Sequence, residues 1–180
     1  MSQKVVDALK RQFPQAVTAT HALCGDHTVI LGAAHLVPVC RFLKEDPAMA
    51  FDMPVDVTAV DYQAYPGGPP HGTRFVAVYH LRSMTHGHRI CLKVPVPDSD
   101  LTVDSVTSVW KGVTWFEREA FDMLGVVFRG HPDLRRILMY PEFVGHPLRK
   151  DYPLRGYQPR MPMPTLSGDP VPGLGGSDEE

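Results

Sequence analysis

WKGVTWFEREAFDMLG (residues 110–125), VVFRGHPDLRRILMYPEFV (126–144) and GHPLRKDYPLRGY (145–157) form one continuous stretch that sets charged residues among large apolar ones. The turn Gly-His-Pro occurs in it twice, at 130–132 and at 145–147, and arginine or lysine follows each turn within a few residues. We therefore expect this stretch to organise the rest of the chain.

A helix is expected in the first part of the stretch, between Thr114 and Gly125. Thr114 and Glu117 have the spacing of a capping box, in which each side chain satisfies a free N–H of the first turn. Gly125 stands where a left-handed residue commonly ends a helix. One apolar face is predicted to contain Phe116, Ala120, Met123 and Leu124. Because Trp115 and Phe121 lie off that face, we expect the helix to be buried on more than one side.

The same helix also carries charged residues, namely Glu117, Arg118, Glu119 and Asp122. Arg118 and Asp122 are i, i+4 neighbours and are able to pair. Glu117 and Glu119 then need cationic partners if they are covered, because an unpaired buried charge is strongly unfavourable. The candidate partners are Arg129, Arg135, Arg136, Arg149 and Lys150. A solvated helix and a catalytic carboxylate pair are alternatives, but a buried network that fixes the following loops, or that another protein completes, is favoured.

Each Gly-His-Pro turn is expected to be a rigid corner, since Pro132 and Pro147 fix φ. For His131 and His146, a side-chain bond that locks the corner is favoured over proton transfer. The basic residues beyond each corner are able to bind the carboxylates of a partner through two parallel hydrogen bonds.

These motifs together resemble the signature of the C subunit of NADH-quinone oxidoreductase, respiratory complex I. The residues that carry the resemblance are Glu117-Arg118-Glu119, Asp122-Met123-Leu124, His131, Arg135, Ile137-Leu138, the run 145–154 and the strand pair 74–81 and 88–96. The likeness extends over about residues 27–157. No departure from the signature is found, although the loop 66–72 is longer than the family leads us to expect.

The resemblance implies a non-redox structural subunit of the hydrophilic arm, peripheral on the cytoplasmic face of the bacterial inner membrane. It implies packing on the D subunit, which shapes the quinone site, and near an iron–sulfur subunit, within an assembly that transfers electrons from NADH to quinone and translocates protons. FMN and iron–sulfur clusters are expected in other subunits, and no cofactor, metal or catalytic residue is expected in this chain. The predicted structural and interface residues are Glu117, Arg118, Glu119, Asp122, His131, Pro132, Arg135, Arg136, His146, Pro147, Arg149, Lys150, Asp151, Tyr152 and Arg155.

Three alternatives stay open at this point. The chain has the same role in a related hydrogenase-like complex or one with another electron donor; it is a soluble enzyme that uses Glu117, Glu119, Arg118 and His131; or it binds nucleic acid. The net charge of -2 argues against nucleic acid. No apolar run is long enough to span a membrane, and the charged N-terminus does not resemble an export signal.

The cysteines and histidines outside the stretch do not predict a metal site. Cys24, Cys40 and Cys91 are far apart, whereas clusters and structural zinc need grouped ligands. We expect these cysteines to be buried as small apolar residues. His80, His86 and His88 are expected at the polar tip of a hairpin.

The rest of the chain predicts an α+β fold, a mainly antiparallel sheet flanked by helices. Helices are expected over 3–13 and 35–44, and strands over 28–31, 55–65, 75–81, 90–96 and 126–128. In the second strand, Val55, Val57 and Ala59 are assigned to one face and Asp61 partly to the other. The order lacks the repeated β-α-β rhythm of a parallel sheet.

Residues 1–150 are therefore predicted to form one domain, and residues 151–180 an extended, proline-rich C-terminal arm. The arm holds prolines 153, 159, 162, 164, 170 and 172, and no apolar period. Its large anchors are Tyr152, Leu154, Tyr157, Met161, Met163 and Leu166, with Arg155 and Arg160 between them. Such a mixture indicates an arm that orders on another subunit, with a solvated tail as the alternative; residues 167–180 are expected to be disordered.

Overall fold

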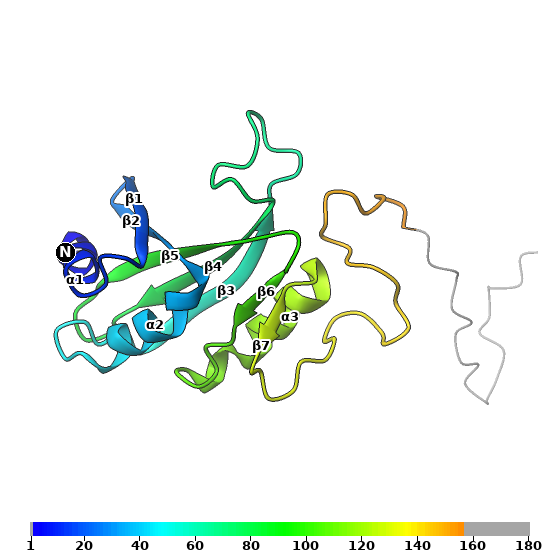
Figure 1. The fold of residues 1–180 in the computed structure, drawn as a ribbon. Coiled ribbons are helices and arrows are strands. Elements are labelled where there is room, and N and C mark those ends of the chain that lie inside the picture. Colours follow the sequence, from blue (N-terminus) through cyan, green and yellow to red (C-terminus); the bar gives the residue numbers. More distant parts are fainter. Residues whose placement is uncertain (1, 157–180) are drawn as a thin grey trace, which may run out of the picture.

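The structure is a computed structural model that describes residues 2–156. Five strands form one sheet in the order β1-β2-β5-β4-β3 (Figure 1). The strands are β1 (Val17–Leu23), β2 (Asp26–Leu31), β3 (Met53–Asp61), β4 (Phe75–Arg82) and β5 (Arg89–Val96). All neighbouring strands are antiparallel except β2 and β5, which pair in parallel, with Thr28 opposite Cys91. The predicted α+β class with a mainly antiparallel sheet is confirmed.

Three helices accompany this sheet: α1 (Ser2–Gln12), α2 (Leu36–Glu45) and α3 (Thr114–Leu124). Short 3-10 turns, η1 (Ala33–His35) and η2 (Lys111–Val113), precede α2 and α3. Figure 1 shows α2 and α3 on the same side of the sheet, with α1 near the β1–β2 hairpin. The main core lies between the helices and the sheet, and its largest buried side chains include Tyr79, Phe51 and Phe128.

A second, two-stranded sheet is formed by one strand before α3 and one strand after it. Its strands, β6 (Thr102–Asp104) and β7 (Val127–Arg129), are parallel, and they come shortly before and directly after the helix. Residues 130–156 then continue without helix or strand around α3 (Figure 1). The path of this long segment therefore depends on side-chain contacts rather than on a regular backbone ladder.

The strand β3 corrects one prediction about which residues share a face. Asp61 is buried together with Val57 and Ala59, so it lies on the core side and not on the other side. Val55 is instead 46% exposed, because the pairing with β4 shifts between Pro54 and Asp56. The carboxylate of Asp61 thus lies inside the protein because β3 alternates regularly from Val57 to Asp61.

The predictions for other elements differ mainly at the ends. Strands β1 and β6 were not predicted, since most of β1 is exposed and β6 is only a short run. Pro38 lies in the first turn of α2, as expected. Cys40 and Cys91 are buried, but the expectation for Cys24 is wrong, because it is exposed beside the β1–β2 turn. Among the described residues, no helix is both long and apolar enough to span a bilayer.

Candidate interaction site around helix α3

The ends of α3 are fixed differently from each other. The predicted capping box is wrong: the residue before the helix is Val113, and the Thr114 hydroxyl donates to the carbonyl of Lys111 at 2.9 Å. At the other end the prediction is confirmed, because Gly125 adopts a left-handed conformation with φ of 80°. The acidic side chain of Glu117 is therefore free to turn into the protein.

Glu117 is completely buried and binds the segment that precedes the helix. Its two carboxylate oxygens accept hydrogen bonds from the Ser105 hydroxyl at 2.6 Å and from the Val106 N–H at 2.8 Å. Burial raises the pKa of Glu117 to about 7, although the two hydrogen bonds oppose this shift. No cation among residues 2–156 pairs with it, so the expected charge partner is wrong.

Asp122 is the second buried carboxylate of α3, and it organises the loop that follows β7. One oxygen pairs with Arg136 at 2.7 Å, and the other accepts three successive backbone N–H groups, those of Ile137, Leu138 and Met139. Burial alone would raise the pKa of Asp122, but these hydrogen bonds and Arg136 lower it below its usual value. The predicted pair between Arg118 and Asp122 is wrong, because Arg136 occupies that place.

Arg118 binds the same loop from the other side. Its guanidinium donates to the carbonyl oxygens of Arg135 and Arg136 at 2.9 and 3.1 Å, and it lies 5.3 Å from the ring centre of Trp115. Glu119 is exposed and takes no part in the described network. Arg118 and Asp122 thus both hold residues 135–139, one through carbonyl groups and the other through N–H groups.

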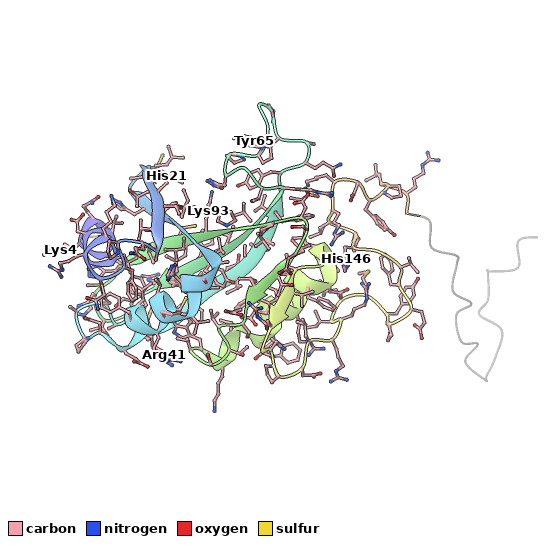
Figure 2. The ribbon with its side chains drawn as sticks, in the orientation of Figure 1. Lys4, His21, Arg41, Tyr65, Lys93 and His146 are labelled. Carbon is pink, nitrogen blue, oxygen red and sulfur yellow. The ribbon has the colours of Figure 1, made fainter. Side chains whose placement is uncertain are left out.

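Both histidines of the Gly-His-Pro turns make the locking bonds that were predicted. Nδ1 of His131 accepts the N–H of Asp133 at 3.0 Å, so its Nε2 donates to the carbonyl of Thr114 at 3.2 Å. His146 is labelled in Figure 2, and its Nδ1 donates to the carbonyl of Asp122 at 2.9 Å. Burial lowers the pKa of His146, which favours the neutral ring. Pro132 and Pro147 follow at each corner.

Arg149 closes the C-terminal end of α3. Its Nε donates to the carbonyl of Leu124 at 2.7 Å, and its guanidinium lies 5.3 Å from the ring centre of Phe75. The basic end of a side chain is favourable at this end of a helix. A Cβ on Gly125 would overlap this guanidinium and lie 2.7 Å from Nε2 of His146. Gly125 therefore provides the space as well as the turn.

Asp61 and Arg74 also hold the segment that follows β7, and sequence reasoning did not include them among the site residues. Asp61 accepts two hydrogen bonds from Arg74, and it also accepts the backbone N–H of Lys150 at 2.8 Å. Arg74 in turn pairs with Asp151 at 3.0 Å. Burial would raise the pKa of Asp61, but Arg74 and the backbone N–H groups lower it to about 2. The signal in the sequence was an acidic residue at a core position of β3.

The start of the predicted arm is therefore fastened to the domain. Besides the contact of Asp151, the ring of Tyr152 stacks on Phe143 at 5.9 Å between centres. Leu154 and Arg155 are exposed, whereas residues 157–180 lie outside the described residues. The predictions for Tyr157, Arg160, Met161, Met163 and Leu166 fall on that part of the chain.

The remaining predicted basic residues lie at the surface. Arg135 pairs with the neighbouring Asp133, and Arg129 pairs with Asp104, both at 2.7 Å. Large apolar side chains are exposed in the same part of the chain: Trp115, Val127, Leu138, Val144, Leu148 and Leu154. The site thus has buried carboxylates that are hydrogen-bonded inside the chain and an outer surface that is partly apolar. Such a surface is typical of an interface with another protein.

Comparisons with known proteins agree with this arrangement. The profile of the family described as "Respiratory-chain NADH dehydrogenase, 30 Kd subunit" matches residues 29–158. The C subunit of NADH-quinone oxidoreductase from Cupriavidus metallidurans is 48% identical over 151 residues, covering 83% of this chain and 76% of that protein. The protein of the same name from Geobacter sulfurreducens is 43% identical over 155 residues, covering 86% of this chain and 91% of that protein.

Two solved structures share the fold. The chain is similar to "Nqo5 of the trypsin-resistant fragment (1-134) in P63 form", with 30% identity and a TM-score of 0.63, over 74% of this chain and 100% of the other. It is also similar to a chain of the membrane-bound sulfane sulfur reductase, an archaeal respiratory membrane complex, with a TM-score of 0.68 over 84% and 85%. At 23% identity, the second likeness shows the fold alone. The family match and the identity to these relatives show that the chain belongs to the 30 Kd subunit family of respiratory-chain NADH dehydrogenase, which includes the C subunits of NADH-quinone oxidoreductase.

Proposed function

We propose that this chain is a non-redox structural subunit of the hydrophilic arm of proton-translocating NADH-quinone oxidoreductase, where it supports the quinone-site subunit. The assembly transfers electrons from NADH to quinone and couples this transfer to proton translocation. In this role the chain binds no cofactor, and FMN and the iron–sulfur clusters lie in other subunits. It is peripheral on the cytoplasmic face of the bacterial inner membrane and also contacts a neighbouring iron–sulfur subunit.

One observation carries this proposal: the buried carboxylates of α3 bind groups that fix the backbone. Glu117 holds Ser105 and Val106, and Asp122 holds Arg136 and three N–H groups. Both side chains are also fully buried, so neither carboxylate is open to a substrate in solution. The same bonds give the irregular segment 130–156 a defined shape, which a docking surface needs in order to avoid a large ordering cost.

The outer surface of that segment supports a protein partner. Leu138, Val144 and Leu148 are each more than half exposed, although they belong to the segment 130–156, which hydrogen bonds from α3 hold in place. Apolar side chains of this size in water favour contact with another protein. The proposal places the quinone-site subunit on this surface and lets the arm beyond Gly156 extend the contact.

A pull-down of the tagged chain from its native membrane, in mild detergent, tests the proposal. Leu148→Asp places a charge on the surface, because the side chain is 54% exposed. We expect this variant to fold but to lose the quinone-site subunit. Met84→Asp is the matched control, because Met84 is 59% exposed at the β4–β5 turn, and it should retain that partner. Equal recovery of the partner with both variants would contradict the proposed surface.

Removal of residues 151–180 is a second test of the arm, and it should abolish co-purification with the quinone-site subunit. A shorter truncation, which removes only residues 157–180, retains the contacts of Asp151 with Arg74 and of Tyr152 with Phe143. Comparing the two truncations separates the effect of losing the arm from the effect of losing these contacts. Normal assembly of the chain without 151–180 would contradict a docking role for the arm.

The structural role is tested against a chemical one at Glu119. This side chain is exposed on α3, so Glu119→Gln should leave both assembly and electron transfer unchanged. A complex that assembles normally but no longer transfers electrons would favour a chemical role. Purified chain should also show no visible absorption band, whereas bound flavin or an iron–sulfur cluster would produce one.

The identities of the co-purifying chains decide between donors. NADH-binding subunits among them would support the complex named above. A set of hydrogenase-like subunits without them would support the same structural role in a complex with another donor.

A further inference from the structure

The face of the five-stranded sheet that points away from α2 and α3 contains a groove with a cavity volume of about 720 Å³. Its floor is a small apolar cluster of Val76, Val78 and Cys91, against which Val60 and Tyr62 pack. This cluster is separate from the main core. Figure 2 shows His21, Tyr65 and Lys93 on this side of the sheet. Within residues 2–156, no helix covers this face (Figure 1).

Cations dominate the polar lining of the groove. They are Arg82, Arg89 and Lys93, accompanied by His21, His27 and His80, and the single acidic residue of the lining is Asp26. The ion pairs found in the described part of the chain involve none of these three cations. The groove therefore presents an excess of positive charge above an apolar floor.

Two of these cations are placed unfavourably for an isolated chain. Arg82 on β4 lies directly opposite Arg89 on β5 in the strand register. Like charges in directly opposed positions of an antiparallel pair destabilise a sheet. In addition, the Nε of Arg82 is buried without a hydrogen-bond partner among residues 2–156. An external carboxylate would compensate the charges of both guanidinium groups.

The ends of the groove add exposed apolar area. Leu23, at the end of β1, is 74% exposed, and Val55 on β3 is 46% exposed. The groove thus combines apolar contacts with cations at two places, the paired Arg82 and Arg89 at the ends of β4 and β5 and Lys93 further along β5. This chemistry fits an extended polypeptide with carboxylates beside large apolar side chains.

We propose that this groove binds an acidic, apolar segment of a partner subunit, whose carboxylates pair with Arg82, Arg89 and Lys93. The inference rests on the proposed function, which places the chain inside a multi-subunit assembly. It adds a second interface on the sheet face, separate from the surface around α3.

The acidic end of this chain fits the groove less well than a partner does. Asp178, Glu179 and Glu180 follow the sequence Gly-Leu-Gly-Gly-Ser, in which Leu174 is the one large apolar residue. Glycine loses more conformational freedom on ordering than any other residue. This end would therefore bring charges with little apolar contact and a high ordering cost.

Zero-length cross-linking of the intact complex tests the inference. A water-soluble carbodiimide joins an amine to a carboxylate when the two groups are paired, and mass spectrometry identifies the joined peptides. We expect an amide between Nζ of Lys93 and an aspartate or glutamate of another subunit. Lys93→Arg keeps the positive charge but should lose this product.

Charge reversal supplies a measurement that does not depend on the reagent. Lys93→Glu should reduce the amount of chain retained in the complex after a salt wash by about tenfold or more. Lys10→Glu is the control, because Lys10 is exposed on α1 and does not line the groove. It should be retained as the native chain is.

The two proposals fail in different ways. A complex that contains the chain but gives no Lys93 product, or gives only products with carboxylates of the same chain such as Glu179 and Glu180, would overturn the inference and leave the proposed function intact. A chain that purifies without other subunits would contradict both.

Discussion

The guanidinium of Arg136 and the carboxylate of Asp122 lie 2.7 Å apart, and the Asp122 side chain is wholly shielded from water. Arg136 also donates to the carbonyl of Gly145 at 3.0 Å, and it lies 5.7 Å from the ring centre of Phe143. One side chain therefore connects helix α3 to two points of the segment 130–156. The segment contains no helix or strand, so its conformation depends strongly on this ion pair.

Loss of the Asp122 carboxylate should destabilise the fold strongly. Asp122→Ala leaves the largely covered Arg136 without its partner and removes the acceptor of three N–H groups. We expect a loss of about 3–5 kcal/mol in the free energy of unfolding, the usual cost of breaking a buried pair from one side. Urea unfolding followed by circular dichroism measures it. Asp133→Ala removes an exposed pair with Arg135 and should have little effect; equal losses would show that burial of Asp122 is unimportant.

The raised pKa of Glu117 predicts a specific dependence of stability on pH. The unfolded carboxyl has a pKa of 4.5 and the folded one about 7, so between these values the folded state holds more protons. The contribution of Glu117 is then largest below pH 4.5 and is lost as the pH rises towards 7. Its size is about 3 kcal/mol.

Glu117→Gln removes this titration, because the amide stays neutral. From pH 4.5 to pH 7.5, the free energy of unfolding of the native chain should fall by about 3 kcal/mol relative to that of the variant. Denaturant unfolding at several pH values measures the shift. A difference that stays constant over this range would mean that Glu117 ionises normally in the fold.

Asp61 should show the opposite dependence, since its folded pKa of about 2 lies below the unfolded 3.8. Its contribution is present above pH 3.8 and is lost as the pH falls towards 2, by about 2 kcal/mol. Asp61→Asn should lose this contribution at neutral pH and should also release residues near Lys150. Limited trypsin digestion should then cleave after Lys150 faster than in the native chain, and an unchanged rate would contradict the fastening role.

Gly125 and Gly130 form a matched pair of substitutions. Both have positive φ, 80° and 82°, so alanine at either position costs about 1–2 kcal/mol in the backbone. At Gly125 the new Cβ would also displace Arg149 and His146, whereas at Gly130 nothing lies within 4 Å. Thermal or urea unfolding should therefore show a larger loss for Gly125→Ala than for Gly130→Ala. Equal losses would show that the contacts of Arg149 and His146 adapt freely.

The sequence predicted well the features that depend on local pattern. Two apolar runs joined by a short turn located β4 and β5, the helical period located α3, and Gly125 was recognised as the end of that helix. The locking role of the two histidines followed from their place in turns that also contain glycine and proline. In each case, residues close in the sequence determine the structure.

The features that depend on distant residues were not predicted. Glu117 was expected to need a cation, but a hydroxyl and an N–H of the segment before α3 satisfy it instead. Asp122 took Arg136, fourteen positions on, rather than its helical neighbour Arg118, because the loop returns across the helix. The partners of Asp61, namely Arg74 and the N–H of Lys150, were likewise not predicted, although the alternation with Val57 and Ala59 indicates the core face that was wrongly assigned.

The parallel pairing of β2 with β5 has a consequence for synthesis of the protein. Thr28 meets Cys91, so β2 leaves the ribosome long before its neighbour in the sheet exists. At about 5–20 residues per second, the wait is roughly three to thirteen seconds. Until then, the β2 edge that later pairs with β5 stays open, in addition to the outer edge of β1, and a nascent chain halted before β5 would offer the β2 edge to chaperones or to other nascent chains.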